Sequence, residues 1–291
     1  MTTTAPSASE SPQHHGRLLA VIWVVASVIA VPLVIWVLGP HLPPGDFTSE
    51  ASDQTSANIV LTAVCTPIVL GVVIYFLYAV FAFRQRGDKL EDGAPIKGHA
   101  QTQTAWIVLT SVLVLALAIW GSLVLVVSAN GAGGGQGPSP VNPPSGEKLQ
   151  VQVIGQQWNW TYRFPSTPLG GAPALETDQL ELPADTLVQF NVTSLDVTHS
   201  FWAYELGVKA DAVPGANNIA FVHTRGTGSF SIRCAELCGL WHGHMFQTGH
   251  VVSKADFASW LVQQAKAEHL NLKYLPPYAT HYFPDPLRRA G

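Results

Sequence analysis

The sequence predicts a membrane-anchored β protein, in which three transmembrane helices precede a Greek-key β-sandwich or barrel on the outer face. Hydrophobic residues make up 47% of the 291 residues and charged residues only 12%, against roughly 25% charged in a typical soluble domain. The hydrophobic pattern also changes along the chain, from long unbroken apolar runs to an alternation of apolar and polar residues after residue 148. Unbroken runs are typical of membrane helices, and alternation is typical of half-buried strands.

Three apolar runs, residues 18–39, 59–83 and 105–127, are expected to form the membrane anchor, 18–127. Each exceeds the roughly 18 apolar residues that identify a membrane helix, and none contains a charge. Pro32 and Pro67 are compatible with this interpretation, because neighbouring helices compensate for a lost backbone hydrogen bond.

The first run could instead be a cleaved signal peptide. Its apolar stretch is longer than such peptides carry, only Arg17 precedes it closely, and no A-x-A cleavage site follows. These features favour a retained span, with residues 1–17 as a cytoplasmic N-terminus. Cleavage of residues 1–39 would leave the remaining topology unchanged.

The distribution of basic residues predicts the orientation. The loop 84–104 contains Arg84, Arg86, Lys89 and Lys97, whereas the loop 40–58 has neither Lys nor Arg. Basic loops remain on the cytoplasmic side. Everything after residue 128 is therefore expected outside.

The outer part begins with a Gly/Pro linker over residues 128–147, followed by a β domain over 148–270. Alternating residues predict strands around 149–153, 158–164, 188–192, 219–221 and 230–234, separated by the turn segments PSTPLGG, LPAD, VPGANN and RGTG. Residues 254–269 are predicted to form a closing helix, with Ser253 and Asp256 in capping-box positions. The tail, 271–291, is expected to be irregular.

A cluster of soft metal ligands stands at residues 234–245, CAELCGLWHGHM. Two thiolates, an imidazole and a thioether suit copper. A single blue-copper ion needs only one cysteine, so Cys234 and Cys238 together indicate two bridging thiolates between two coppers. Each copper then needs a histidine, for which His242 and the upstream His199 are the candidates, and Met245 is the thioether.

Other interpretations of this cluster fit less well. Zinc sites normally use C-x2-C pairs rather than this C-x3-C spacing, and a structural disulfide would leave His242 and Met245 unexplained. Attachment of haem c needs C-x-x-C-H, which is absent from the sequence. His244 is the alternative to His242, but neighbours on an extended segment point opposite ways, so His244 is expected to be exposed or outside the ligand set. His223 and His250 are expected to be ordinary strand histidines.

The segment from Asp196 to Met245 resembles the copper domain of subunit II of haem-copper cytochrome c oxidases. The segment 155–165, GQQWNWTYRFP, resembles the aromatic stretch at the start of that domain, and the resemblance extends over residues 59–270. It implies a cupredoxin-like fold with a dinuclear copper centre, known as CuA. Its function would be electron entry, from cytochrome c to a haem-bearing subunit that reduces oxygen to water.

The resemblance also implies roles for individual residues. Cys234 and Cys238 would bridge the coppers, His199 and Met245 would complete one copper, and His242 with the backbone carbonyl of Glu236 would complete the other. The Glu236 side chain would reach a magnesium ion shared with the catalytic subunit. Trp158 would accept electrons from cytochrome c, whereas Trp160 is expected in the core; Asp196 and Asp211 match acidic interface positions, or serve as turn or capping residues.

The implied partners are subunit I, subunit III, cytochrome c and the membrane of a bacterial cell, with no nucleic acid. This subunit would not bind oxygen or catalyse a reaction by itself. One departure concerns the stretch GHAQTQTAW, where Gln103 or Gln101 replaces the family's glutamate, so the proton-uptake route is open. The alternatives are a structural oxidase subunit that has lost its copper, which the complete ligand set disfavours, and an electron-transfer module serving another reductase.

Overall fold

The computed structural model describes residues 12–82, 84, 98–124, 146–164 and 175–269. The expectations for the first residues, most of the loop 84–104, the linker and the C-terminal tail therefore lie outside the described residues. The chain divides into two compact units, Met1–Leu42 with Ser56–Val114 and Pro43–Thr55 with Leu115–Gly291. Each unit is described by itself.

Three long apolar helices occupy the N-terminal part, as predicted. They are α1 (Pro12–Leu33), which continues into a π-helical turn η1 (Val34–Leu38) and a 3-10 turn η2 (Gly39–His41), then α2 (Ser49–Ala82) and α3 (Ala100–Leu123). Their mean hydropathies over the candidate spans are 2.9, 2.5 and 2.2. Apolar side chains are exposed along these helices, for example Val28 at 66% and Leu109 at 69%. Such exposure is stable only where lipid or a partner covers it.

A contact between α1 and α2 lies at the proline of the second helix. The indole Nε1 of Trp23 donates a hydrogen bond to the Pro67 carbonyl at 2.7 Å. A Cβ at Gly71 would come within 3.3 Å of the same nitrogen. This hydrogen bond joins α1 to α2 beside the proline.

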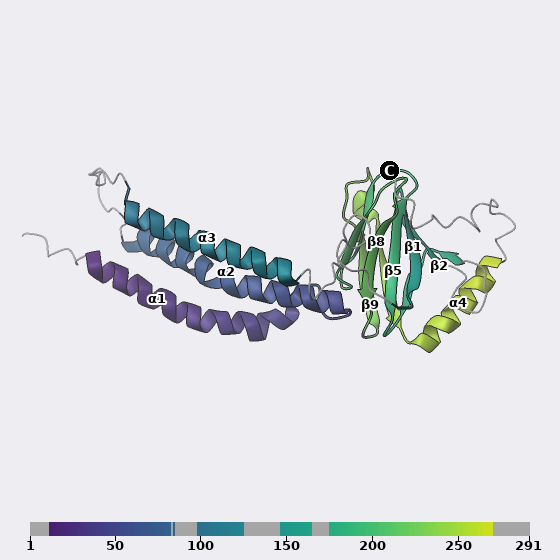
Figure 1. Ribbon diagram of the computed structural model, residues 1–291, viewed down its shortest axis with the longest axis horizontal. Helices are drawn as coiled ribbons and strands as arrows, with labels where there is room; N and C mark the ends of the chain where they lie inside the picture. Colours follow the sequence, from purple (N-terminus) through teal and green to yellow (C-terminus); the bar gives the residue numbers. More distant parts are fainter. Residues whose placement is uncertain (1–11, 83, 85–97, 125–145, 165–174, 270–291) are drawn as a thin grey trace, which may run out of the picture. The chain divides into compact units, whose positions relative to one another are not determined.

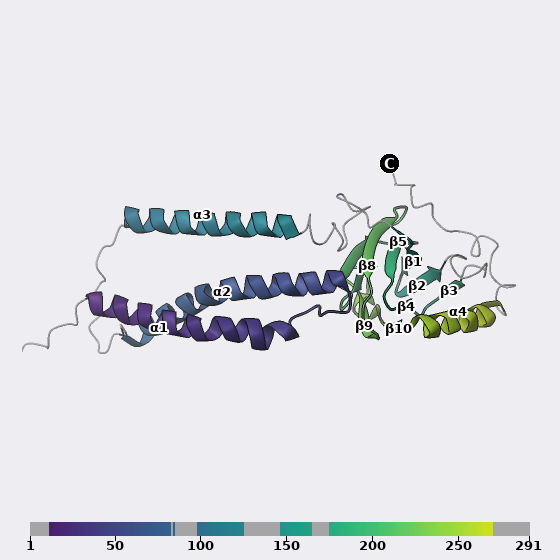
Figure 2. The ribbon, with the colours of Figure 1, turned by 60° about the horizontal axis from the view of Figure 1, so that its bottom comes forward.

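The outer domain is a sandwich of two five-stranded sheets (Figures 1 and 2), with strand orders β3-β2-β1-β5-β8 and β4-β10-β9-β6-β7. The strands are β1 (Leu149–Gln156), β2 (Asn159–Phe164), β3 (Leu175–Thr177), β4 (Glu181–Pro183), β5 (Leu187–Ser194), β6 (His199–Ala203), β7 (Val208–Ala212), β8 (Asn218–His223), β9 (Gly228–Cys234) and β10 (Phe246–Val252). Residues of both sheets share one hydrophobic core. This is the predicted cupredoxin-like fold.

The five predicted strands are present, and five further strands were not predicted. The segment LPAD was wrongly interpreted as a turn, because Leu182 and Pro183 lie in β4 and pair with β10. The chain turns only afterwards, at Asp185, whose φ is +48°. Three-residue strands such as β4 are too short to show an alternating pattern, and β6 is almost wholly buried, so neither gives the expected signal.

Aromatic side chains fill the core beside the first residues of β6. The ring of Phe201 lies 5.5 Å from Trp160, 6.4 Å from Tyr162 and 5.4 Å from Phe190, measured between centroids. Trp160 is fully buried, so its predicted core position is confirmed. Because His199 lies two residues before Phe201, it points to the same side of the strand and faces this core.

Helix α4 (Lys254–His269) closes one edge of the sandwich. Its first turn carries the predicted cap, in which the Asp256 amide donates to Ser253 Oγ at 3.1 Å and Ser253 Oγ donates to Asp256 Oδ2 at 2.6 Å. Phe257 and Trp260 pack against Phe164, with ring centroids 6.0 and 5.4 Å away. The cap and this contact fix the helix on the core.

The segment Pro43–Thr55 belongs to the same unit as the sandwich, which the sequence did not indicate. Thr48 is fully buried and forms an isolated bridge with Thr224. Its hydroxyl donates to the Leu206 carbonyl at 2.8 Å and accepts the Ala51 amide at 2.9 Å. The start of α2 is therefore anchored on the outer domain.

Candidate metal centre

The loop 235–245, called the ligand loop because it carries most of the predicted ligands, joins two neighbouring antiparallel strands and is hydrogen-bonded at both ends. Strand β9 ends at Cys234 and β10 begins at Phe246. The Cys234 amide donates to the Met245 carbonyl at 3.1 Å, and the Ala235 amide donates to the Ser200 carbonyl at 2.9 Å. These bonds hold the loop in one conformation at the end of the second sheet.

His199 reaches the loop from β6, where its side chain is fully buried. It lies against Gly155 of the facing sheet, and a Cβ at that position would come within 3.1 Å of the imidazole Cδ2. Trp160 packs edge-on to the ring at 5.9 Å between centroids. The ring therefore has little freedom to turn.

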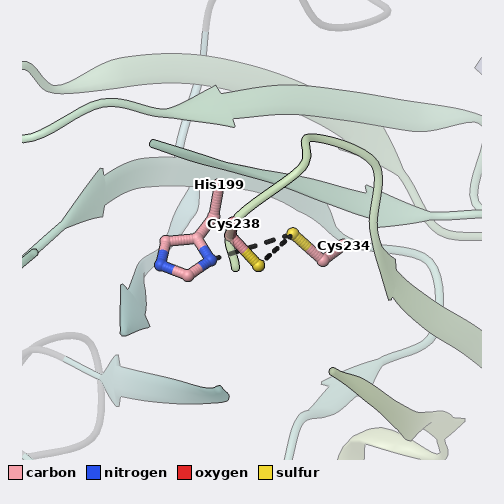
Figure 3. A group of neighbouring side chains, drawn as sticks. All are labelled: His199, Cys234 and Cys238. Carbon is pink, nitrogen blue, oxygen red and sulfur yellow. Dashed lines mark hydrogen bonds between the residues drawn. The ribbon is translucent and has the colours of Figure 1, made fainter. Parts of the chain in front are cut away.

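The predicted ligand atoms converge on two sulfurs. In Figure 3 the imidazole of His199 and the two thiols point toward one another, with His199 Nδ1 3.8 Å from Cys234 Sγ and the sulfurs 3.7 Å apart. Cys238 Sγ lies 3.5 Å from His242 Nδ1 and 3.9 Å from Met245 Sδ. The Glu236 carbonyl oxygen lies 3.2 Å from Cys234 Sγ. All six predicted groups thus surround one small space.

The chemistry of this donor set fits a soft metal cation. Both cysteines are free thiols. Burial, and secondarily the neighbouring Cys234, raises the pKa of Cys238 to about 12. A thiolate here is therefore costly unless a cation neutralises it, which bound metal does.

Asp196 orients the histidine, a role that the sequence did not reveal. Its carboxylate accepts the Gln157 amide at 2.7 Å and lies 2.9 Å from His199 Nε2. Partial burial works to raise the pKa of Asp196, but hydrogen bonds from Gln157, His199 and Val197 outweigh it and lower the pKa. A carboxylate at Nε2 keeps the proton there and turns the Nδ1 lone pair to the sulfurs. The D-x-x-H spacing was the available signal.

Trp158 contacts the ligand loop directly. Its indole Nε1 donates to the Cys238 carbonyl at 3.1 Å, and Gln157 Nε2 donates to the same oxygen at 2.9 Å. Gly239 permits this approach, because its φ is +115° and a Cβ would lie 2.9 Å from Gln157 Nε2 and 3.2 Å from the Trp158 ring. The side chain is half-buried, so it links solvent to the loop.

Three described histidines of the outer domain, His223, His244 and His250, lie outside this cluster. His244 is exposed and packs on Trp241 at 5.2 Å between centroids, as expected. The sequence analysis based this exposure on an extended segment, which was wrong, because His242–His244 form a 3-10 turn. His223 and His250 are exposed on strands, and His250 Nδ1 lies 3.0 Å from Ser229 Oγ.

Two predicted residues have side chains on the surface. The Glu236 side chain is exposed, although its carbonyl faces the sulfurs. Gln103 is exposed in the first turns of α3. Asp211 lies on β7, where Ser200 Oγ donates to its carboxylate at 2.8 Å.

Residues 166–252 match the family model "Cytochrome C oxidase subunit II, periplasmic domain". The chain is 25% identical to cytochrome c oxidase subunit 2 of Synechocystis sp. over 301 aligned residues, 90% of this chain and 87% of that protein. It is 35% identical to a probable cytochrome c oxidase subunit 2 of Rickettsia prowazekii over 134 residues, covering 40% of this chain and 43% of that protein.

A solved structure is also similar. The periplasmic domain of subunit II of cytochrome oxidase of Bradyrhizobium japonicum shares 30% identity, with a TM-score of 0.39, and covers 43% of this chain and 97% of that one.

The fold and the site together define a membrane-anchored cupredoxin-like protein with a possible metal site of two cysteines and a histidine. The chain is similar to subunit II of cytochrome c oxidases, through the family model matched over residues 166–252 and through curated relatives over most of its length. It is a membrane protein whose β domain lies on the outer face, and it is a subunit of an oxidoreductase.

Proposed function

We propose that this chain is the electron-entry subunit of a respiratory cytochrome c oxidase. It takes electrons from cytochrome c through a dinuclear copper centre and delivers them to the haem-bearing subunit I, which reduces oxygen to water. The chain itself neither binds oxygen nor catalyses a reaction alone. The observation that carries the proposal is the convergence of His199, Cys234, Cys238, His242 and Met245 around one space.

The residues that would hold the coppers are Cys234 and Cys238, shared by the two ions, with His199 and Met245 for one ion and His242 and the Glu236 carbonyl for the other. When bound, such a pair of coppers supplies reversible one-electron exchange. The tied loop and the buried His199 keep the ligands in place, so little rearrangement accompanies a change of charge.

Trp158 is the proposed point of electron entry. Its indole N–H donates a hydrogen bond to the carbonyl of Cys238, a proposed copper ligand. A route of covalent and hydrogen bonds therefore joins the aromatic ring to the ligand set. Around the loop, exposed apolar side chains offer a surface for a protein partner, with Leu237 at 78% and Leu240 at 86% exposure. This surface suits the cytochrome or the catalytic subunits I and III.

A magnesium ion at the boundary with the catalytic subunit is the second proposed cofactor. Glu236 has an exposed carboxylate, and carboxylate oxygens are the ligands that Mg²⁺ prefers. Its backbone carbonyl faces the sulfurs at the same time. Glu236 would thus face the copper centre with its carbonyl and the magnesium ion with its carboxylate.

The proposed topology is a multi-pass protein of the bacterial plasma membrane. The three long apolar helices and the basic loop 84–104 support it. An even distribution of Lys and Arg between the loops would have left the orientation open.

The test is a copper titration of the full chain in detergent, followed by electron paramagnetic resonance. We expect a mixed-valence signal split by two equivalent copper nuclei. Cys238→Ser should abolish that signal, whereas His244→Ala, on the same loop but outside the ligand set, should leave it unchanged. A mononuclear copper signal in the unaltered chain would overturn the dinuclear centre.

The oxidase assignment needs a separate measurement. Purification from membranes under mild conditions should yield a complex that contains haem and consumes oxygen with reduced cytochrome c as donor. A dinuclear copper signal in a chain that purifies with a haem-free reductase would instead favour an electron-transfer module for that reductase.

A further inference from the structure

The tight turn between β1 and β2 lies against the ligand loop. Only two residues, Gln157 and Trp158, separate the paired ends of these strands. Both side chains donate a hydrogen bond to the Cys238 carbonyl, Gln157 Nε2 at 2.9 Å and Trp158 Nε1 at 3.1 Å. Cys238 itself lies in neither a helix nor a strand. Its backbone is therefore held by side chains that come from the facing sheet.

The backbone of Gln157 contacts a second part of the site. Its amide donates to Asp196 Oδ2 at 2.7 Å, and Asp196 Oδ1 lies 2.9 Å from His199 Nε2. Gln157 is thus linked to His199 through its backbone and to Cys238 through its side chain. A substitution removes the second link and keeps the first, because every residue except proline has a backbone N–H. The two links can therefore be separated by experiment.

The Cys238 carbonyl precedes a bend of the ligand loop that leads to His242. Gly239 has a φ of +115°, a conformation that favours glycine, and its carbonyl accepts the His242 amide at 3.2 Å. His242 Nδ1 in turn lies 3.5 Å from Cys238 Sγ. A donor on the Cys238 carbonyl restricts the peptide between Cys238 and Gly239. It therefore also restricts the position of His242.

Burial does not account for the position of the Gln157 side chain. The residue is exposed, whereas Trp158 is half-buried and packs against the hydrophobic core. Cys238 is only 3% exposed. Loss of the Gln157 side chain would therefore leave the core filled, but it would remove a hydrogen bond to the backbone of a buried cysteine. This separates Gln157 from residues that act by packing.

We propose that Gln157 is a positioning residue for Cys238 and His242 in the metal centre. Its side-chain amide holds the Cys238 carbonyl and keeps the ligand loop in the closed conformation, in which the two sulfurs lie 3.7 Å apart. One hydrogen bond of this kind favours a conformation by about 2–10-fold. The role of Gln157 in electron transfer rests on the proposed copper centre, whereas its effect on the loop belongs to the metal-free chain as well.

The first test measures the reactivity of Cys238 in the metal-free full chain in detergent. Alkylation of a buried thiol requires local opening, so its rate follows the population of the open loop. In Gln157→Leu, which lacks the donor, we expect iodoacetamide to alkylate Cys238 about 2–10-fold faster, as measured by mass spectrometry. Gln157→Glu keeps the shape of the side chain but has no N–H when ionised, so it should react at least as fast as Gln157→Leu.

The matched control is Gln156→Leu, because Gln156 is the preceding glutamine and is half-buried at the end of β1. This change should leave the alkylation rate of Cys238 as it is in the unaltered chain. An unchanged rate in Gln157→Leu, or an equal rise in Gln156→Leu, would overturn the proposal. A rise in Gln157→Glu alone would also overturn it, since the added charge and not the lost donor would then be the cause.

The second test uses the copper-loaded chain. Transfer of copper to a chelator should be about 2–10-fold faster in Gln157→Leu, and unchanged in Gln156→Leu. Unchanged transfer in Gln157→Leu would overturn its role at the metal centre. Absence of a dinuclear copper signal in the unaltered chain would overturn the proposed function but not the alkylation result. A dinuclear signal together with unchanged Cys238 alkylation would overturn only the role of Gln157.

Discussion

The hydrogen bond between Asp196 and His199 determines which imidazole nitrogen faces the sulfurs. The carboxylate lies 2.9 Å from Nε2, which leaves Nδ1 toward Cys234. Removing the carboxylate should let the imidazole change tautomer, because packing and not Asp196 restricts rotation of the ring. We expect Asp196→Ala to weaken copper binding about 10–100-fold, the usual cost of losing such an outer partner. Competition titration against a chelator measures this.

The control for that variant is Asp178→Ala, which removes an exposed carboxylate between β3 and β4. It should bind copper as the unaltered chain does. Equal losses in the two variants would mean that general negative charge, rather than orientation of His199, determines the affinity.

A second prediction concerns the indole N–H of Trp158. Trp158→Phe keeps the aromatic ring but removes the donor to the Cys238 carbonyl. We expect slower reduction by cytochrome c with unchanged copper content, measured by stopped-flow absorbance. Trp241→Phe, on the exposed surface of the same loop, should have a smaller effect. Loss of copper in the Trp158 variant would assign the residue to packing.

The grouping of the proposed ligand residues could be predicted from the sequence, because soft-metal chemistry uses few side-chain types at short spacings. His199 could be found because a strand was expected just before it. The role of Gly239 could not, since it depends on the turn that brings Gln157 and Trp158 to the loop, whereas the D-x-x-H spacing of Asp196 and His199 was present but not interpreted. Trp158 also lies outside the segment that matches the family model.

At the scale of elements, the start of α2 is the feature that sequence reasoning did not find. Residues 43–55 show no alternation, and their contacts are made by caps and single side chains. Glu50 Oε2 accepts the His223 amide at 2.9 Å, and a Cβ at Gly207 would lie 2.9 Å from the Ala51 backbone. Such contacts leave no periodic pattern, so hydrophobic periodicity cannot reveal them.

Thr48→Val tests the contribution of this segment. The change keeps the shape but removes the helix cap and leaves the buried Leu206 carbonyl without its donor. We expect the outer domain to lose about 1–3 kcal/mol of unfolding free energy. Denaturant unfolding followed by tryptophan fluorescence measures it. Ser49→Ala, which removes only a hydroxyl bonded to Glu50, serves as the control and should cost less.

At the scale of the whole molecule, the chain combines two units with different solvents. The apolar runs 18–39, 59–83 and 105–127 contain no charge, and most of their residues belong to the first unit, whereas the proposed ligands and the aromatic core all belong to the second. A ligand that binds only the folded outer unit stabilises that unit by mass action. Copper binding therefore tests whether the chain unfolds as two cooperative units or as one.

We expect copper at about 100 times its dissociation constant to stabilise the outer unit by about 2.7 kcal/mol. In detergent, thermal unfolding followed by aromatic circular dichroism should shift to higher temperature, because the aromatic core of the sandwich reports that unit. Loss of helical signal, dominated by α1, α2 and α3, should keep its midpoint. Cys238→Ser should remove the shift. If both signals moved together with copper, the two units would unfold as one.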